Sequence, residues 1–102
     1  MKKSERTHLS RVADLGCIVC NNLGYENSPA EIHHVLSGCG MGQRASNYDV
    51  IPLCPIHHRH GGNGTAIHAG QKSFERNFGS EVDLLLQVHV ALGIKILEEY
   101  SK

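Results

Sequence analysis

The chain has 102 residues, of which 40% are hydrophobic, and its ten Lys and Arg balance ten Asp and Glu to a net charge of zero. A zero net charge argues against nucleic-acid binding through a broad basic surface. No apolar run approaches the roughly 18 residues of a membrane span, so we expect a soluble cytoplasmic protein. The length predicts a single domain over residues 1–102.

The composition predicts a small core that needs a cross-link or a metal ion. The chain has no Trp, two Phe and three Tyr, but four Cys and eight His. Large apolar side chains are therefore few, and domains with little core are commonly held by disulfides or metals. Because cytoplasmic thiols stay reduced, the Cys residues favour a metal over disulfides.

The N-terminal segment is predicted to be a helix over residues 4–15. Leu9, Val12 and Leu15 recur at a spacing that places them on one helical face, and Gly16 follows where a helix ends. This helix leads directly into the first pair of cysteines.

Two strands are expected on either side of a glycine-rich connection. Residues 21–29 are rich in Asn, Gly and Ser and predict a loop, after which residues 30–36 predict the first strand. Residues 37–47 form the long connection. Residues 48–53 predict the second strand, with Pro52 at a sheet edge or at the strand end because proline donates no ladder hydrogen bond.

The C-terminal third predicts a turn followed by two helices. Residues 61–65, GGNGT, form the turn, and residues 69–78 have helical spacing. Ser80 and Asp83 mark the start of a final helix that continues to Glu98. Its predicted apolar stripe comprises Val82, Leu85, Leu86, Val90, Ile94 and Leu97.

Two close pairs of metal-binding side chains predict a structural zinc site. Cys17 and Cys20 form a CxxC pair, and Cys54 and His57 form a CxxH pair further along the chain. Together they supply the four soft-to-borderline ligands that tetrahedral zinc prefers. His60 is the alternative fourth ligand, because its spacing from Cys54 also allows it to reach the ion.

A second constellation consists of histidines. His33 and His34 are adjacent on a predicted strand and point to opposite sides, so one can bind a metal while its neighbour faces substrate. His58 and His68 follow in the same region. A phosphodiester is hydrolysed when a metal ion stabilises the scissile phosphate and a neutral imidazole takes a proton from water. The dense histidines favour this chemistry, whereas Cys39, in the glycine-rich connection, is interpreted as a free thiol.

Several strings of the sequence resemble a known family. IHHV at residues 32–35, DVIPLC at residues 49–54 and the following His58 resemble the HNH endonuclease superfamily. GMGQRAS, VIPLCPIHH and AIHAGQKSFERNFG resemble the phage and prophage recombination-enhancement nucleases of the Ref type. The resemblance implies a ββα-metal fold, in which two strands and a helix hold one ion.

The resemblance also implies roles for individual residues. His33 and His58 become ligands of the catalytic metal, which is Mg²⁺, Mn²⁺ or Zn²⁺, and His34 becomes the general base that activates water. Asp49 lies at the position where most members of the superfamily have an asparagine, the N of the name HNH. Its carboxylate is expected to orient the His34 ring through a hydrogen bond.

The third ligand of this catalytic site has two candidates. The position that the family normally uses, one helical turn after the second ligand, is Gly62 in this chain. His68 is the expected third ligand, provided that the GGNGTA segment returns the chain to the ion. His60 is the reserve candidate.

DNA is the expected partner. The candidate phosphate contacts are Arg44, Arg59, Lys72 and Arg76, which lie near the histidines in the sequence. A solvated surface would carry the same residue types, so both interpretations stay open. Ref-type nucleases act on DNA held in a RecA filament, so the resemblance implies RecA as a second partner.

We therefore expect an α+β domain in which a zinc-supported β-hairpin and helix, treble-clef-like, are flanked by N- and C-terminal helices. The expected function is metal-dependent DNA cleavage in phage or prophage recombination. One alternative is a non-catalytic zinc-binding module that binds DNA or a protein, and a DNA nicking assay with Mg²⁺ or Mn²⁺ separates the two. A structural phage protein with incidental histidines is the other alternative, which an absence of bound zinc would favour.

Overall fold

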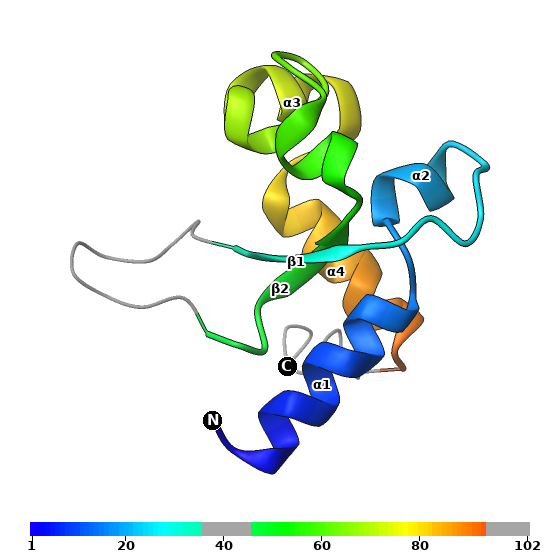
Figure 1. Cartoon of the computed structure of the whole chain (residues 1–102), viewed down its shortest axis with the longest axis vertical. Helices are drawn as coiled ribbons and strands as arrows, with labels where there is room; N and C mark the ends of the chain where they lie inside the picture. The colour runs from blue at the N-terminus through cyan, green and yellow to red at the C-terminus, as the bar shows by residue number, and fades with distance from the viewer. Residues whose placement is uncertain (36–45, 94–102) are drawn as a thin grey trace, which may run out of the picture.

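The computed structural model describes residues 1–35 and 46–93, which form helices around a two-stranded antiparallel sheet (Figure 1). The elements are α1 (Lys3–Asp14), α2 (Ile18–Asn22), β1 (Glu31–His34), β2 (Val50–Leu53), η1 (Ile56–His60), η2 (Ile67–Ala69), α3 (Gln71–Phe78) and α4 (Glu81–Ala91). None of the helices in these two ranges is long and apolar enough to cross a membrane. Cys39 and Arg44, most of the predicted connection, and the stripe positions Ile94 and Leu97 lie outside the described residues.

The two strands pair over four residues each, with Glu31 opposite Leu53 and His34 opposite Val50. Both strands are shorter than the sequence predicts. Pro52 lies opposite Ile32. Because each strand of this two-stranded sheet is an edge strand, the missing N–H of Pro52 can face away from the ladder, which agrees with the predicted edge position.

Strand β2 is the centre of the core, since all four of its residues are buried and it contacts α1, α2 and α4. The fully buried apolar side chains around it come from every part of the described chain. They include Val12, Val50, Ile51, Leu53, Phe74, Leu84 and Val88. The sheet is therefore held between the N-terminal and C-terminal helices, with α3 and α1 at opposite ends of the molecule (Figure 1).

Helix α1 matches the predicted N-terminal helix. It begins where the backbone N–H of Lys2 donates to the Glu5 carboxylate over 2.7 Å, which satisfies an amide that would otherwise have no partner at the helix start. Its buried face carries His8 and Val12. The opposite face is exposed and is rich in basic and hydroxyl side chains.

Helix α4 begins as predicted but buries a different face. The Ser80 hydroxyl accepts a hydrogen bond from the Asp83 backbone N–H over 3.1 Å. Leu84 and Val88 are fully buried, whereas Val82 and Val90 are 48% and 61% exposed. The predicted stripe was therefore wrong at Val82 and Val90. Apolar residues occur on most sides of this helix, so their spacing does not identify the face that packs on the sheet.

Candidate metal centres

The four predicted zinc ligands lie together where α2, the end of β2 and η1 meet. The short helix α2, which the sequence did not predict, holds the CxxC pair. Cys17 precedes the helix and its Sγ accepts from the Cys20 backbone N–H over 3.5 Å. One helical turn thereby brings both sulfur atoms to the same side. Cys54 follows β2, and His57 lies three residues later in η1.

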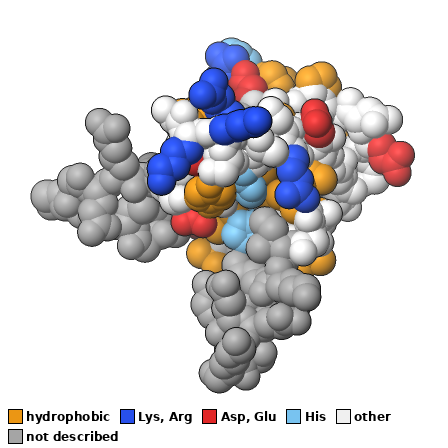
Figure 2. Space-filling model, turned by 90° about the horizontal axis from the view of Figure 1, so that it is seen from below, with side chains coloured by type: hydrophobic (Ala, Val, Ile, Leu, Met, Phe, Trp, Pro, Cys, Tyr) orange, Lys and Arg blue, Asp and Glu red, His pale blue; other side chains and the backbone are white. Residues whose placement is uncertain are grey.

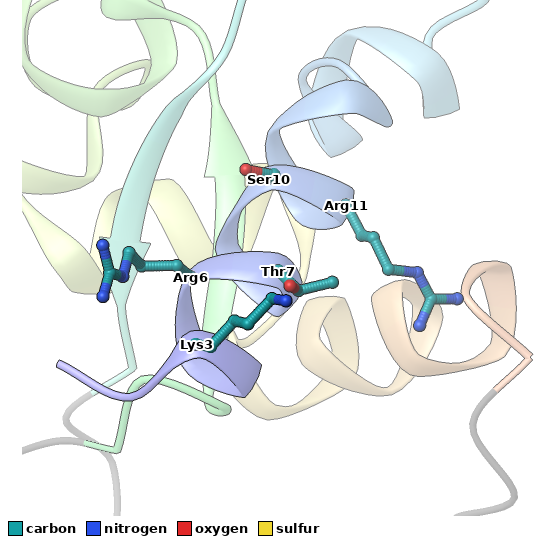
Figure 3. A pocket seen from close by; sticks show the side chains of 5 residues that line it. All are labelled: Lys3, Arg6, Thr7, Ser10 and Arg11. Carbon is teal, nitrogen blue, oxygen red and sulfur yellow. The ribbon is translucent and has the colours of Figure 1, made fainter.

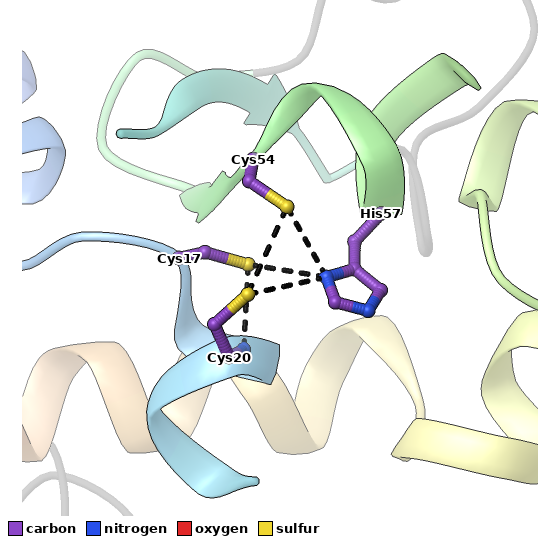
Figure 4. Close-up of side chains that lie close together, drawn as sticks. All are labelled: Cys17, Cys20, Cys54 and His57. Atoms are coloured by element: carbon purple, nitrogen blue, oxygen red, sulfur yellow. Dashed lines mark hydrogen bonds between the residues drawn. The ribbon is translucent and has the colours of Figure 1, made fainter. Parts of the chain in front are cut away.

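The distances within this Cys₃His cluster fit one tetrahedral ion (Figure 4). The Sγ atoms of Cys20 and Cys54 are 3.8 Å apart, and the three sulfurs lie 3.3, 3.5 and 3.6 Å from His57 Nδ1. Around zinc, with bonds of about 2.3 Å to sulfur and about 2.0 Å to nitrogen, tetrahedral geometry places two sulfurs roughly 3.8 Å apart and a sulfur and a nitrogen roughly 3.5 Å apart. The cluster can therefore bind a metal ion without rearrangement.

The electrostatics of the cluster also favour a cation. None of Cys17, Cys20 and Cys54 forms a disulfide, and all three are buried. Burial raises the pKa of the Cys17 thiol to about 12, and burial lowers the pKa of His57. A thiolate in this position therefore needs a positive charge beside it, while the imidazole is kept neutral and able to bind a metal. His60 is exposed and belongs to neither histidine-containing cluster of the described chain.

A second cluster joins His33, His58 and His68, which come from β1, η1 and η2. Their candidate ligand atoms all lie within 4.8 Å of one another. The Nε2 atoms of His58 and His68 are 3.0 Å apart, close to the roughly 3.3 Å that separates two imidazole nitrogens on one tetrahedral ion. His33 is buried, His58 is half-buried and His68 is exposed, so the cluster opens to solvent on one side.

The glycine turn between η1 and η2 explains how His68 reaches this cluster. A Cβ atom on Gly61 would lie 2.5 Å from the Ile56 carbonyl oxygen, so only glycine fits there. Gly62 has a φ of +82°, which a right-handed helix does not adopt. The helical segment therefore stops after His60, and the chain turns back to place His68 against His58.

A carboxylate holds the other ring nitrogen of His58. Glu31 Oε1 lies 2.8 Å from His58 Nδ1, and the same carboxylate accepts hydrogen bonds from the Arg59 guanidinium. The hydrogen bonds from Arg59 and His58 lower the pKa of Glu31 to about 2. The carboxylate therefore stays ionised, and it leaves His58 Nε2 directed at His68. Such carboxylate–histidine pairs commonly orient metal-binding imidazoles.

Glu81 holds His33 in a comparable way. Its Oε2 lies 2.6 Å from His33 Nε2, and the Glu81 side chain is only 2% exposed. Burial lowers the pKa of His33, while the hydrogen bond and the charge of Glu81 act in the opposite direction. Sequence reasoning missed both carboxylates. Glu31 had a local signal, because strand alternation puts it on the same face as His33, but Glu81 is 48 residues away from its partner.

His34 is separated from the three clustered histidines by the alternation of β1. Its Nε2 lies 2.9 Å from Asn47 Oδ1. The described residues show no hydrogen bond between the His34 ring and the Asp49 carboxylate, and Asp49 is exposed. In this structure the turn before β2 presents Asn47 to the imidazole, while the Asp49 backbone carbonyl accepts from the Val35 N–H over 2.9 Å. The orienting role expected of Asp49 stays a prediction.

The predicted phosphate contacts fall in different environments. Arg59 is ion-paired with Glu31, which partly compensates its charge. Lys72 and Arg76 are exposed, one helical turn apart on α3. Three exposed cations that were not predicted as phosphate contacts line a common groove on α1. Within the described residues, they are Lys3, Arg6 and Arg11.

A model of the family described as "Recombination enhancement, RecA-dependent nuclease" matches residues 2–92. The match covers α1, both strands, the Cys₃His cluster, the three-histidine cluster and α4. No curated protein matches the chain.

Proposed function

Because the chain belongs to the family of recombination-enhancement, RecA-dependent nucleases, we propose that it is an HNH-type, metal-dependent DNA endonuclease. The family's description implies nuclease activity, a DNA substrate and a relationship to RecA. The HNH assignment rests on one observation above all. His33, His58 and His68 converge on a common point, while His34, next to His33 in the sequence, is held by an asparagine.

In this proposal β1, β2 and η1 correspond to the two strands and the helix of a ββα-metal site. The glycine turn splits the helix, so the third ligand is His68 rather than a residue one turn after His58. The Cys₃His cluster is a structural zinc site. Its four protein ligands leave no open position for substrate, and it fixes α2 against the end of β2.

The three histidines would hold a divalent ion, and Glu31 and Glu81 orient two of their rings. Such an ion supplies positive charge that stabilises the scissile phosphate and the leaving oxygen. His33 and Glu81 are both buried, so the pair is fixed by packing as well as by its hydrogen bond. The exposed side of the cluster, at His68, leaves room for a phosphate to approach.

His34 is the general base. Its Nε2–H donates to Asn47 Oδ1, so the lone pair stays on Nδ1. Nδ1 takes a proton from a water molecule as the water oxygen forms a bond to phosphorus and the ester oxygen leaves. Asn47 then takes the role of the asparagine in the HNH motif, which is to orient the catalytic histidine.

The test is cleavage of plasmid DNA by the purified protein with Mg²⁺ or Mn²⁺, with and without RecA. His34→Ala should keep the fold and both metals and lose roughly two to four orders of magnitude in cleavage rate. His33→Ala should also lose affinity for the second metal. The matched control is His60→Ala, which removes an exposed histidine outside both clusters and should cleave like the parent. Parental cleavage by His34→Ala would rule out this mechanism.

A further inference from the structure

The outer face of α1 carries a continuous stripe of basic and hydroxyl side chains. Lys3, Arg6, Thr7 and Ser10 are all exposed and follow the spacing of one helical face. With Arg11 they line one open groove, and Figure 3 shows Arg6 and Arg11 extending to opposite sides of the helix. The opposite face of α1 packs on the sheet, so the stripe does not serve the core.

The groove is lined by three cations, Lys3, Arg6 and Arg11, although the net charge of the chain is zero. Among the described residues, no acidic side chain lines it. Glu5, the acidic residue of the first helical turn, is engaged elsewhere: hydrogen bonds with the Lys2 backbone and the Asn47 side chain lower its pKa. Arg11 is anchored by donating to the Leu92 carbonyl over 2.9 Å, which keeps its charge at the edge of the groove. Figure 2 shows Lys and Arg side chains gathered on the face seen from below.

The first turn of α1 is connected to the proposed general base through the turn before β2. The Tyr48 hydroxyl donates to Ser4 Oγ over 2.9 Å, so the first turn of α1 is tied to the turn before β2. Asn47 in turn holds the His34 ring. The N-terminal end of the stripe is therefore linked to His34 through contacts of the turn that carries Asn47 and Tyr48.

We propose that this face of α1 is a docking surface for the phosphodiester backbone of DNA and leads the strand to His34; the proposal rests on the proposed function. Lys, Arg, Ser and Thr are the usual donors to phosphate oxygens. From Lys3 to Ser10 the helix rises roughly 10 Å, which matches about three steps of 3.4 Å along one DNA strand.

The experiment measures DNA binding separately from cleavage. In a His34→Ala background, which prevents cutting, the affinity for a short fluorescent duplex is measured by anisotropy from about 50 to about 200 mM salt. Lys3→Gln with Arg6→Gln should weaken binding several-fold and lower the slope of log K against log salt by about 2, roughly 1 for each lost phosphate contact. A merely structural role for these side chains would change the melting temperature and leave the slope unchanged.

The charge-matched comparison is Lys72→Gln with Arg76→Gln, which removes two cations from α3 at the other end of the molecule. A larger loss of DNA affinity and of salt slope in the α1 variant supports the proposal. An equal or larger loss of both in the α3 variant overturns it. If the α1 variant binds DNA like the His34→Ala protein, and the same two substitutions with His34 intact abolish cleavage only on RecA-coated DNA, the surface is assigned to RecA and the proposal is overturned. If the parent does not cleave DNA, but the α1 variant still lowers the slope of log K against log salt, only the proposed function is rejected and the DNA-binding surface stands.

Discussion

Cys54→Ser should separate a structural metal site from a set of merely buried thiols. Cys54 is 7% exposed, and its Sγ lies 3.3 Å from His57 Nδ1 and 3.8 Å from Cys20 Sγ. Structural zinc binds with an apparent free energy of about 10–16 kcal/mol, so one of four ligands accounts for roughly 3 kcal/mol. A domain of this size has a free energy of unfolding of about 5–15 kcal/mol, and each kcal/mol shifts Tm by about 4–8 °C. The Tm of Cys54→Ser should therefore fall by at least about 12 °C.

The assay combines thermal denaturation, followed by circular dichroism, with zinc content measured on protein prepared without a His-tag. The parent should hold one tightly bound zinc per chain in this cluster, and a strong chelator should lower its Tm as the substitution does. Cys39→Ser is the matched control, because no metal-binding spacing connects Cys39 to the other cysteines. A Cys54→Ser protein that keeps its zinc and melts like the parent would refute the assignment.

Three further predictions concern the second metal and the acid stability. Glu81→Gln should weaken binding of the second ion by roughly 10- to 100-fold in titration calorimetry while zinc in the Cys₃His cluster stays bound. His68→Ala should abolish binding of the second ion, and His60→Ala should not; the reverse result would make His60 the third ligand. Burial and the nearby His89 lower the pKa of His8 from its ordinary value of 6.5. Below pH 6.5 the unfolded chain therefore takes up a proton that the folded protein does not, and the free energy of unfolding should fall as the pH drops. His8→Leu should reduce this fall in urea denaturation between about pH 7 and pH 5.

The grouping of Cys17, Cys20, Cys54 and His57 was predictable because the spacing within each pair is local. CxxC and CxxH place two ligands on one turn of chain, whatever the rest of the fold does. The choice between His57 and His60 was not predictable, since both spacings can reach an ion. It depends on η1, whose path buries His57 and leaves His60 exposed.

Contacts between distant segments were not visible in the sequence. Glu81 meets His33 across 48 residues because α4 packs behind the sheet, and no periodic pattern encodes that approach. The same packing decides which face of α4 is buried. Its apolar residues lie on most sides, so the sequence predicted a helix and its start at Ser80 but not the burial of Leu84 and Val88.

Asn47 and Asp49 offer a direct test of which side chain orients His34. Asn47→Ala removes the oxygen that accepts from His34 Nε2, so neither the ring orientation nor the position of its proton is fixed. We expect a loss of roughly 10- to 100-fold in cleavage rate, with unchanged affinity for the second ion because Asn47 is not part of the three-histidine cluster. Asn47→Asp keeps an acceptor oxygen and should retain most of the activity.

Asp49→Ala is the matched control, two residues away and exposed, and it should cleave like the parent. Asn47 lies in the turn that Tyr48 ties to α1, so the Tm of Asn47→Ala must be measured to verify that α1 stays in place. An unchanged Tm together with a lower kcat would identify a positioning role. If Asp49→Ala were the slow variant and Asn47→Ala cleaved normally, His34 would be oriented by Asp49 during the reaction, and the role assigned to Asn47 would be wrong.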